Sequence, residues 1–254
     1  MAGKVIIAGA GPGDEGLLTL KCLEAIRAAD VIIYDRLIPM SALKYARNDA
    51  ELIFAGKEPG RHIMEEDEII RIMILRAGSG KNVLRLHGGD PFLFGRGFEE
   101  CLAVLNAGIP CEVIPGVTSA IAVPEYFLIP PVLRGVSSSV AIVTGMEDPR
   151  KGKSFVNFKE LAKAVNSLII LMGASRIRDI AKELIEGGMD PGTPVAIITR
   201  AFMENTKITI ATVGSVAAGK VVAENPSVII VGSVVSEGLK AMKLANIKHE
   251  EIDT

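Results

Sequence analysis

The chain has 254 residues, of which 49% are hydrophobic and 23% charged, enough for one large or two modest domains with a buried core. Its formal net charge of -2 provides no basic excess and argues against a nucleic-acid partner. Three cysteines without a C-x-x-C pair and three separated histidines form no metal-ligand pattern, so we expect no metal and a reducing, cytoplasmic setting. The apolar run after Met1 is too short for a signal peptide, and no apolar run approaches the roughly 20 residues that cross a bilayer. We therefore expect no membrane association.

In the first half of the chain, short β-branched runs alternate with helical patterns. The predicted strands are 4–8, 31–35, 51–55, 82–86 and 111–115. The predicted helices are 17–30, 41–46, 65–78, 97–108 and 118–123. Such alternation indicates an α/β fold whose sheet is mostly parallel and covered by helices on both faces.

The alternation breaks at PEYFLIPPVLR (124–134), where three prolines should continue neither a helix nor a central strand. We interpret this stretch as a connection between two domains. The predicted organisation is an N-terminal α/β domain, a linker, a C-terminal α/β domain and a polar tail, over residues 1–123, 124–135, 136–240 and 241–254.

In the second half the alternation resumes. PVAIITRA (194–201) and KITIATVG (207–214) are separated by only a short polar stretch, which predicts a hairpin and therefore a mixed second sheet. Further strands are predicted in SVAIVTG, SLIILMG and SVIIVGSVV, which begin at residues 139, 167 and 227.

The stretch GAGPGD (9–14) lies between a predicted strand and a helix, and Asp35 ends the next strand, as in a dinucleotide-binding fold. Two features disagree with that interpretation. Asp14 would repel a pyrophosphate, and Pro12 lacks the N–H that a phosphate cradle uses. An NAD-dependent oxidoreductase therefore stays a rival hypothesis, and a tight structural turn is the simplest alternative.

Three further loops follow predicted strands. RLHGGDPFLFGRGFEE (85–100) offers backbone groups and a carboxylate, which suit a ligand with an amino group and hydroxyls. VIPGVTSAIAVPEY (113–126) contains Thr118 or Ser119 as a helix cap. YDRL (34–37) and FAGKEPGRH (54–62) gather one acid and several cations, which are either solvated loop charges or a surface for an anionic ligand.

Taken in order, GAGPGD, YDRL, GKxxGRH, RLxGGDPFxFGRGxEE and VIPGVTSA resemble the tetrapyrrole methylase family, from about Val5 to Gly232. YDRL with GRGFEE is typical of the branch that methylates uroporphyrinogen III. The resemblance implies two α/β domains with S-adenosyl-L-methionine in the cleft between them, and a homodimer. The implied reaction is methylation of uroporphyrinogen III at C2 and C7 to give precorrin-2, with S-adenosyl-L-homocysteine as the second product, in sirohaem or cobalamin biosynthesis.

The resemblance also implies roles for individual residues. Asp35 matches the proton acceptor and Lys57 the proton donor. The cofactor-binding positions are Pro12, Gly88, Gly89, Asp90, Leu93, Thr118, Ser119, Met172 and Ala201. Leu133 stands where the family usually has a histidine, so a different tetrapyrrole precursor or a catalytically silent tetrapyrrole-binding protein remains an alternative.

The chemistry of methyl transfer is compatible with these residues. Displacement of a methyl group from a sulfonium needs alignment rather than a protein nucleophile. The ring must lose a proton, which Asp35 could accept if burial raises its pKa. A substrate with several carboxylates needs cations, for which the candidates are Arg36, Arg61, Arg96 and Arg134.

Overall fold

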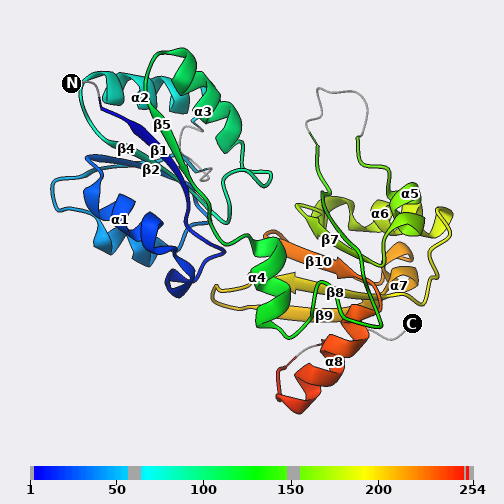
Figure 1. Ribbon diagram of the computed structural model, residues 1–254. Helices are drawn as coiled ribbons and strands as arrows, with labels where there is room; N and C mark the ends of the chain where they lie inside the picture. Colours follow the sequence, from blue (N-terminus) through cyan, green and yellow to red (C-terminus); the bar gives the residue numbers. More distant parts are fainter. Residues whose placement is uncertain (1–2, 57–63, 148–154, 249, 252–254) are drawn as a thin grey trace. The chain divides into compact units, whose positions relative to one another are not determined.

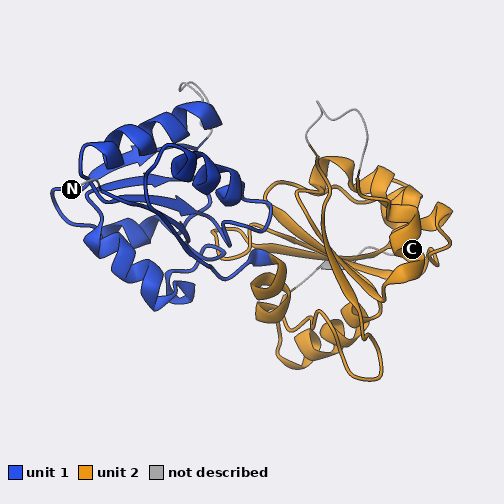
Figure 2. Cartoon of the chain, turned by 45° about the horizontal axis from the view of Figure 1, so that its top comes forward, with its two compact units in different colours: residues 1–119 blue, residues 120–254 orange. Residues whose placement is uncertain are grey.

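The computed structural model describes residues 3–56, 64–147, 155–248 and 250–251. The chain divides into two compact units, residues 1–119 and 120–254 (Figure 2). Each unit is built around its own sheet.

The first unit contains a five-stranded sheet in the order β3-β2-β4-β1-β5, and every pairing in it is parallel. Its strands are β1 (Val5–Gly9), β2 (Val31–Tyr34), β3 (Glu51–Phe54), β4 (Val83–His87) and β5 (Cys111–Ile114). Its helices are α1 (Leu20–Ala28), α2 (Glu66–Gly78) and α3 (Gly97–Asn106), with 3-10 turns η1 (Glu15–Leu17) and η2 (Met40–Tyr45). The predicted parallel sheet is confirmed.

Helices cover both faces of this sheet, α2 and α3 on one side and α1 on the other (Figure 1). Alternation along each strand supplies the two buried faces: Ile7 and Val83 pack with the α2 and α3 side, whereas Ile6 and Leu84 pack with the α1 side. The first turn of α2 carries three acidic residues and its last turn carries Arg76, which complements the helix dipole.

The second unit contains a six-stranded sheet in the order β11-β9-β8-β10-β7-β6. Its strands are β6 (Val140–Thr144), β7 (Ser167–Leu171), β8 (Pro194–Thr199), β9 (Lys207–Thr212), β10 (Ser227–Val231) and β11 (Glu250–Glu251). Its helices are α4 (Ser119–Tyr126), α5 (Phe158–Ala164), α6 (Ile177–Glu186), α7 (Val213–Ala217) and α8 (Val234–Leu244), with the 3-10 turn η4 (Ala174–Arg176). The strands β8 and β9 pair antiparallel, which confirms the predicted hairpin and the mixed sheet.

Three local features differ from expectation. Pro124 lies inside α4 rather than in a non-helical connection, because its side chain and those of Ala120 and Val123 are buried and packing outweighs the lost hydrogen bond. At the other end of the unit, α8 continues to Leu244, beyond the expected start of the polar tail. The cysteines are not all reduced, because a disulfide joins Cys101 on α3 to Cys111 on β5.

Among the described residues, no helix is long and apolar enough to span a membrane.

Candidate active site

Three glycine-containing loops, which follow β1, β4 and β5, meet at the carboxyl edge of the first sheet. The N–H of Gly11 donates to the carbonyl of Gly89 at 3.2 Å, and the N–H of Gly89 donates to the carbonyl of Gly11 at 2.7 Å. A Cβ at Gly9 would lie 2.6 Å from the Cα of Gly116, and a Cβ at Gly116 would lie 2.6 Å from the Cα of Gly9. The glycines at positions 9 and 116 are therefore required for the loops to pack backbone against backbone.

The packing accounts for the stretch GAGPGD without a bound phosphate. The Asp14 carboxylate accepts a hydrogen bond from the N–H of Gly16 at 2.7 Å and caps η1. The first α-helix begins only at Leu20, with Thr19 as its cap. A dinucleotide site instead places a helix N-terminus directly after the glycine loop. The structure of this stretch therefore argues against the NAD hypothesis.

Asp90 organises the loop after β4. Its Oδ1 accepts hydrogen bonds from the N–H groups of Phe92 and Leu93 at 2.9 and 3.1 Å, and its Oδ2 accepts from the N–H of Gly116 at 3.0 Å. One carboxylate thus fixes its own loop and ties it to the loop after β5. Asp90 therefore shapes the predicted cofactor loops through hydrogen bonds to their backbone. The sequence predicts Asp90 only as a cofactor-binding position and does not reveal this structural role.

Four charged side chains form a closed ring beside these loops. Arg85 donates from Nη2 to Oδ1 of Asp35 at 2.8 Å and from Nε to Oε1 of Glu100 at 2.9 Å. His87 completes the ring, with Nδ1 3.3 Å from Oδ2 of Asp35 and Nε2 2.7 Å from Oε2 of Glu100. The side chains of Arg85, His87 and Glu100 are at most 4% exposed, whereas that of Asp35 is 29% exposed. Asp35 is thus the member that solvent or a ligand can reach.

The fold explains why these four residues meet. On β4, Arg85 and His87 alternate with leucines and share the face that α2 and α3 cover. Glu100 lies on the buried stripe of α3 with Cys101 and Val104. Asp35 follows β2, the neighbour of β4, and its N–H donates to the carbonyl of Leu86 at 3.2 Å.

The geometry makes His87 an imidazolium. Both ring nitrogens face carboxylate oxygens, and a neutral ring would turn a lone pair toward one of them. Burial lowers the pKa of His87, but the hydrogen bonds to Asp35 and Glu100 outweigh it and the pKa is raised above 6.5. The four charged side chains therefore comprise two cations and two anions, an arrangement that offsets the cost of removing charges from water.

The expectation that burial gives Asp35 a raised pKa is wrong. Burial does raise it, but the hydrogen bond from His87 and the charge of Arg85 outweigh burial, and the pKa of Asp35 falls below 3.8. Asp35 is consequently an ionised carboxylate and a weak base at neutral pH.

The other predicted residues of the first unit divide into three groups. Gly88 lies against Leu37 and so adjoins the loop of Asp35, whereas Gly89 lies against Thr118 and Ser119, which follow β5. They are half-buried, as are Pro12, Asp90 and Leu93. Arg36 is exposed next to Asp35, whereas Arg96 pairs with Glu66 at the start of α2. Lys57 and Arg61 lie outside the described residues, so their predicted roles stay predictions.

Comparison with known proteins identifies the family. The chain matches the tetrapyrrole (corrin/porphyrin) methylases over residues 4–217. The chain belongs to this family.

Similar members cover nearly the whole chain. The uroporphyrinogen-III C-methyltransferase of Methanocaldococcus jannaschii is 46% identical over 93% of this chain and 98% of its own length. The Bacillus subtilis protein of the same name is 44% identical over 92% of this chain and 91% of its own length. A Thermus thermophilus uroporphyrin-III C-methyl transferase, solved in complex with S-adenyl homocysteine, superposes with a TM-score of 0.80 at 38% identity, over 92% of this chain and all of that one.

The predicted residues of the second unit follow two strands of its sheet. Met172 directly follows β7, and Ala201 lies two residues beyond Thr199, the last residue of β8. The two strands flank β10 and pair antiparallel with it, so both positions lie at one edge of the sheet. Met172 and Arg200 both have left-handed backbones, with φ values of 55° and 54°. Such conformations cost energy and cluster at binding sites, which agrees with a functional edge. Arg134 is exposed in the same unit.

Sequence reasoning missed Arg85, His87 and Glu100 as parts of the site. A usable signal exists on β4. Helices cover both faces of a parallel sheet, so its central strands should be apolar, but two basic residues occupy alternate positions of this strand. Glu100 carries a similar signal, because it occupies an apolar position in the stripe of α3.

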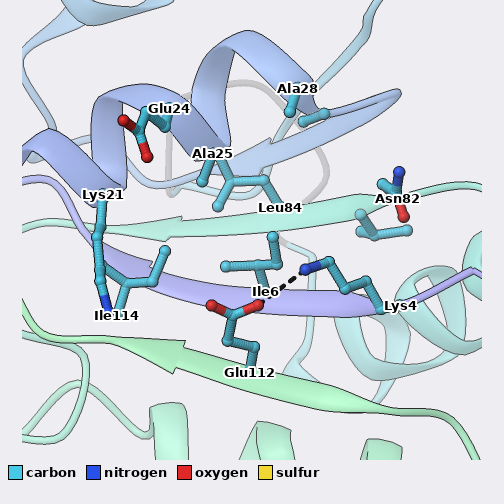
Figure 3. A pocket seen from close by; sticks show the side chains of 12 residues that line it. Lys4, Ile6, Lys21, Glu24, Ala25, Ala28, Asn82, Leu84, Glu112 and Ile114 are labelled. Atoms are coloured by element: carbon cyan, nitrogen blue, oxygen red, sulfur yellow. Dashed lines mark hydrogen bonds and ion pairs between the residues drawn. The ribbon is translucent and has the colours of Figure 1, made fainter.

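A separate hollow of about 270 Å³ lies between α1 and the strands β1, β4 and β5. Figure 3 shows its apolar floor, which includes Ile6 and Leu84, and the ion pair of Lys4 with Glu112 at its rim. None of the predicted site residues lines it. Within the described parts of the chain, no group of histidine, cysteine and acidic side chains could hold a metal ion.

Proposed function

We propose that this chain transfers methyl groups from S-adenosyl-L-methionine to C2 and C7 of uroporphyrinogen III, giving precorrin-2. The proposal rests on one observation above all: a single, partly exposed carboxylate, Asp35, is held by buried cations at the edge where the family's cofactor loops meet. The names of the relatives and the complex of the Thermus thermophilus protein support the choice of substrate and cofactor.

The loops at the carboxyl edge of the first sheet fit S-adenosyl-L-methionine better than a nucleotide with phosphates. Glycine backbone and the hydroxyls of Thr118 and Ser119 offer hydrogen-bonding groups for an amino acid and a ribose. Pro12 and Leu93 add apolar surface. Met172 and Ala201 remain predicted cofactor positions. The cofactor supplies a methyl group activated as an electrophile by a positively charged sulfur.

The lowered pKa of Asp35 is compatible with a role as proton acceptor. A pyrrole ring gains positive charge as it gains the methyl group, and such a ring is a strong acid. A weak carboxylate base that is always ionised can stabilise that charge and then accept the proton. A base with a raised pKa is therefore unnecessary. Lys57 stays the predicted proton donor.

The reaction is tested by incubating the protein with uroporphyrinogen III and S-adenosyl-L-methionine carrying a labelled methyl group, followed by mass spectrometry of the tetrapyrrole. We expect a product with two added methyl groups. A folded protein that gives no methylated product would contradict the proposal, and a product from another tetrapyrrole precursor would change the substrate. Calorimetric titration should show binding of S-adenosyl-L-homocysteine, and binding of NAD alone would favour the oxidoreductase.

Two variants separate catalysis from cofactor binding. Asp35→Ala should lower turnover by about 10²–10⁴-fold and leave the affinity for S-adenosyl-L-homocysteine nearly unchanged. Asp90→Ala releases three backbone donors and should weaken that affinity about tenfold. The matched control is Asp190→Ala, which removes a carboxylate that accepts from the N–H of Gly192 in the second unit and should change neither quantity. Equal loss of affinity in the Asp35 and Asp90 variants would show that the roles are wrongly divided.

We also propose a homodimer that binds an anionic tetrapyrrole, with Arg36, Arg61, Arg96 and Arg134 as the candidate contacts. Light scattering of the purified protein should give twice the chain mass of 26.9 kDa. A monomer at working concentration would contradict the dimer and leave the methyl transfer unaffected.

A further inference from the structure

The imidazole of His87 lies between two carboxylates. The proposed reaction does not by itself explain this position. Three described charged groups face it: Asp35 after β2, Glu100 on α3 and Arg85 on its own strand. Nδ1 faces Asp35, and Nε2 faces Glu100. Of these two carboxylates, only Glu100 is buried as deeply as His87, so the imidazole connects a buried anchor to the partly exposed carboxylate of Asp35.

We propose that His87 is a positioning residue that fixes the orientation of the Asp35 carboxylate toward the substrate. The proposal rests on the proposed methyl transfer. Arg85 holds Oδ1 of Asp35 and His87 holds Oδ2, so the two donors together prevent rotation of the carboxylate about its Cβ–Cγ bond. Glu100 holds the opposite side of both cations and fixes them in turn. Asp35, whose side chain is 29% exposed, is the part of this arrangement that a substrate can reach.

Protonation of His87 is part of this arrangement. A neutral ring can donate to only one of its two carboxylates, so loss of the proton releases either Asp35 or the anchor Glu100. Burial lowers the pKa of His87, but its two hydrogen bonds raise it above the ordinary value, which favours the charged imidazole. The orienting effect should therefore weaken as the pH rises through that pKa.

Two variants of His87 distinguish the roles of the two nitrogens of its imidazole. An asparagine amide nitrogen overlaps the position of Nδ1 and a glutamine amide nitrogen that of Nε2, so His87→Asn keeps the donor to Asp35 and His87→Gln keeps the donor to Glu100. With saturating substrates, we expect His87→Gln to lower kcat about tenfold and His87→Asn to lower it by less than about threefold. The affinity for S-adenosyl-L-homocysteine should be unchanged in both. Neither side chain titrates, so both variants should lose the alkaline fall in kcat that the parent chain shows.

The control is Arg76→Gln, which breaks a half-exposed ion pair with Glu51 in the same unit and should alter neither kcat nor its pH profile. Equal kcat values for His87→Asn and His87→Gln, or an alkaline limb that persists in both, would overturn the positioning role and leave the methyl transfer standing. Absence of methylated product from the parent chain would overturn both.

A measurement on the unsubstituted protein tests the geometry even if a variant fails to fold. Nitrogen-15 NMR of the histidine rings should show both nitrogens of His87 protonated at pH 7. A ring with one unprotonated nitrogen at that pH would overturn the proposal.

Discussion

The two sheets of this chain bury different kinds of side chain. Among the described residues, the buried charged groups Arg85, His87 and Glu100 all belong to the first unit. The described polar residues that are buried in the second unit carry hydroxyls only, and its main core, which includes Phe158 and Ile229, is apolar. One sheet therefore keeps an ionic ring beside its carboxyl edge, whereas the other is stabilised by apolar packing.

This difference indicates that the buried charges of the first sheet serve the chemistry of the site rather than stability. Burying ions is costly, and a complete ring of charges only offsets that cost, so apolar side chains would serve stability equally well. An ionic ring at the edge where three loops meet is better explained by the need to orient Asp35. The stability of the first unit should therefore respond strongly to single charge deletions and to pH, and that of the second unit to neither.

The largest effect is expected from Arg85→Met. Removal of this cation leaves the buried Glu100 and the partly exposed Asp35 with one positive partner, and we expect the free energy of unfolding to fall by about 3–5 kcal/mol. Turnover should be lost as well. Urea unfolding followed by circular dichroism measures the change. Arg76→Met, which removes a half-exposed pair, should cost less than about 1 kcal/mol, and equal costs for the two variants would refute the distinction between them.

A smaller effect is expected where the loops cross. Gly116→Ala places a Cβ 2.6 Å from the Cα of Gly9, and the strain should cost about 1–3 kcal/mol and weaken binding of S-adenosyl-L-homocysteine. The control is Gly78→Ala at the end of α2, where an added Cβ meets nothing within 4 Å. It should be neutral or slightly stabilising by about 0.4–1 kcal/mol. Unchanged cofactor affinity in Gly116→Ala would show that the loop crossing does not shape the site.

Much of the fold could be predicted because local periodicity determines it. The alternation of strands and helices predicts the parallel first sheet, and the short PVAIITRA to KITIATVG connection predicts the hairpin. The prediction that Pro124 lies outside a helix is wrong because burial of its neighbours in α4 outweighs its local preference.

The site was harder to predict because its geometry depends on contacts distant in sequence. The positions of Asp35 and the glycine loops follow from motif order, but the direction of the Asp35 pKa depends on His87 and Arg85, which approach it only when β2 and β4 pair. A sequence shows that an aspartate ends a strand and does not show which cations lie on the next one.

Dependence on pH provides a finer test of the comparison. The stability that His87 contributes is fully present below its ordinary pKa of 6.5 and is lost as the pH rises through its raised value. The free energy of unfolding should therefore fall above pH 6.5, by at most about 1.4 kcal/mol per pH unit for one proton. His87→Asn should lack this fall. Asp35, whose pKa is lowered, contributes stability that is lost only as the pH falls below 3.8, outside this range. Unfolding curves between pH 6.5 and 9 measure the slope, and identical slopes in both proteins would place the linked proton elsewhere.

The smallest effect is expected from Ile229→Val in the core of the second unit. The residue is 1% exposed on β10 and packs in the cluster with Phe158, so loss of one methylene should cost about 0.5–1.5 kcal/mol. Because the described core around it contains no ionisable group, the cost should be the same at pH 6.5 and pH 9. Turnover at saturating substrate should be unchanged. A cost that varies with pH would mean that the second unit senses charge in the first, and the separation of an ionic from an apolar sheet would no longer describe how this protein is stabilised.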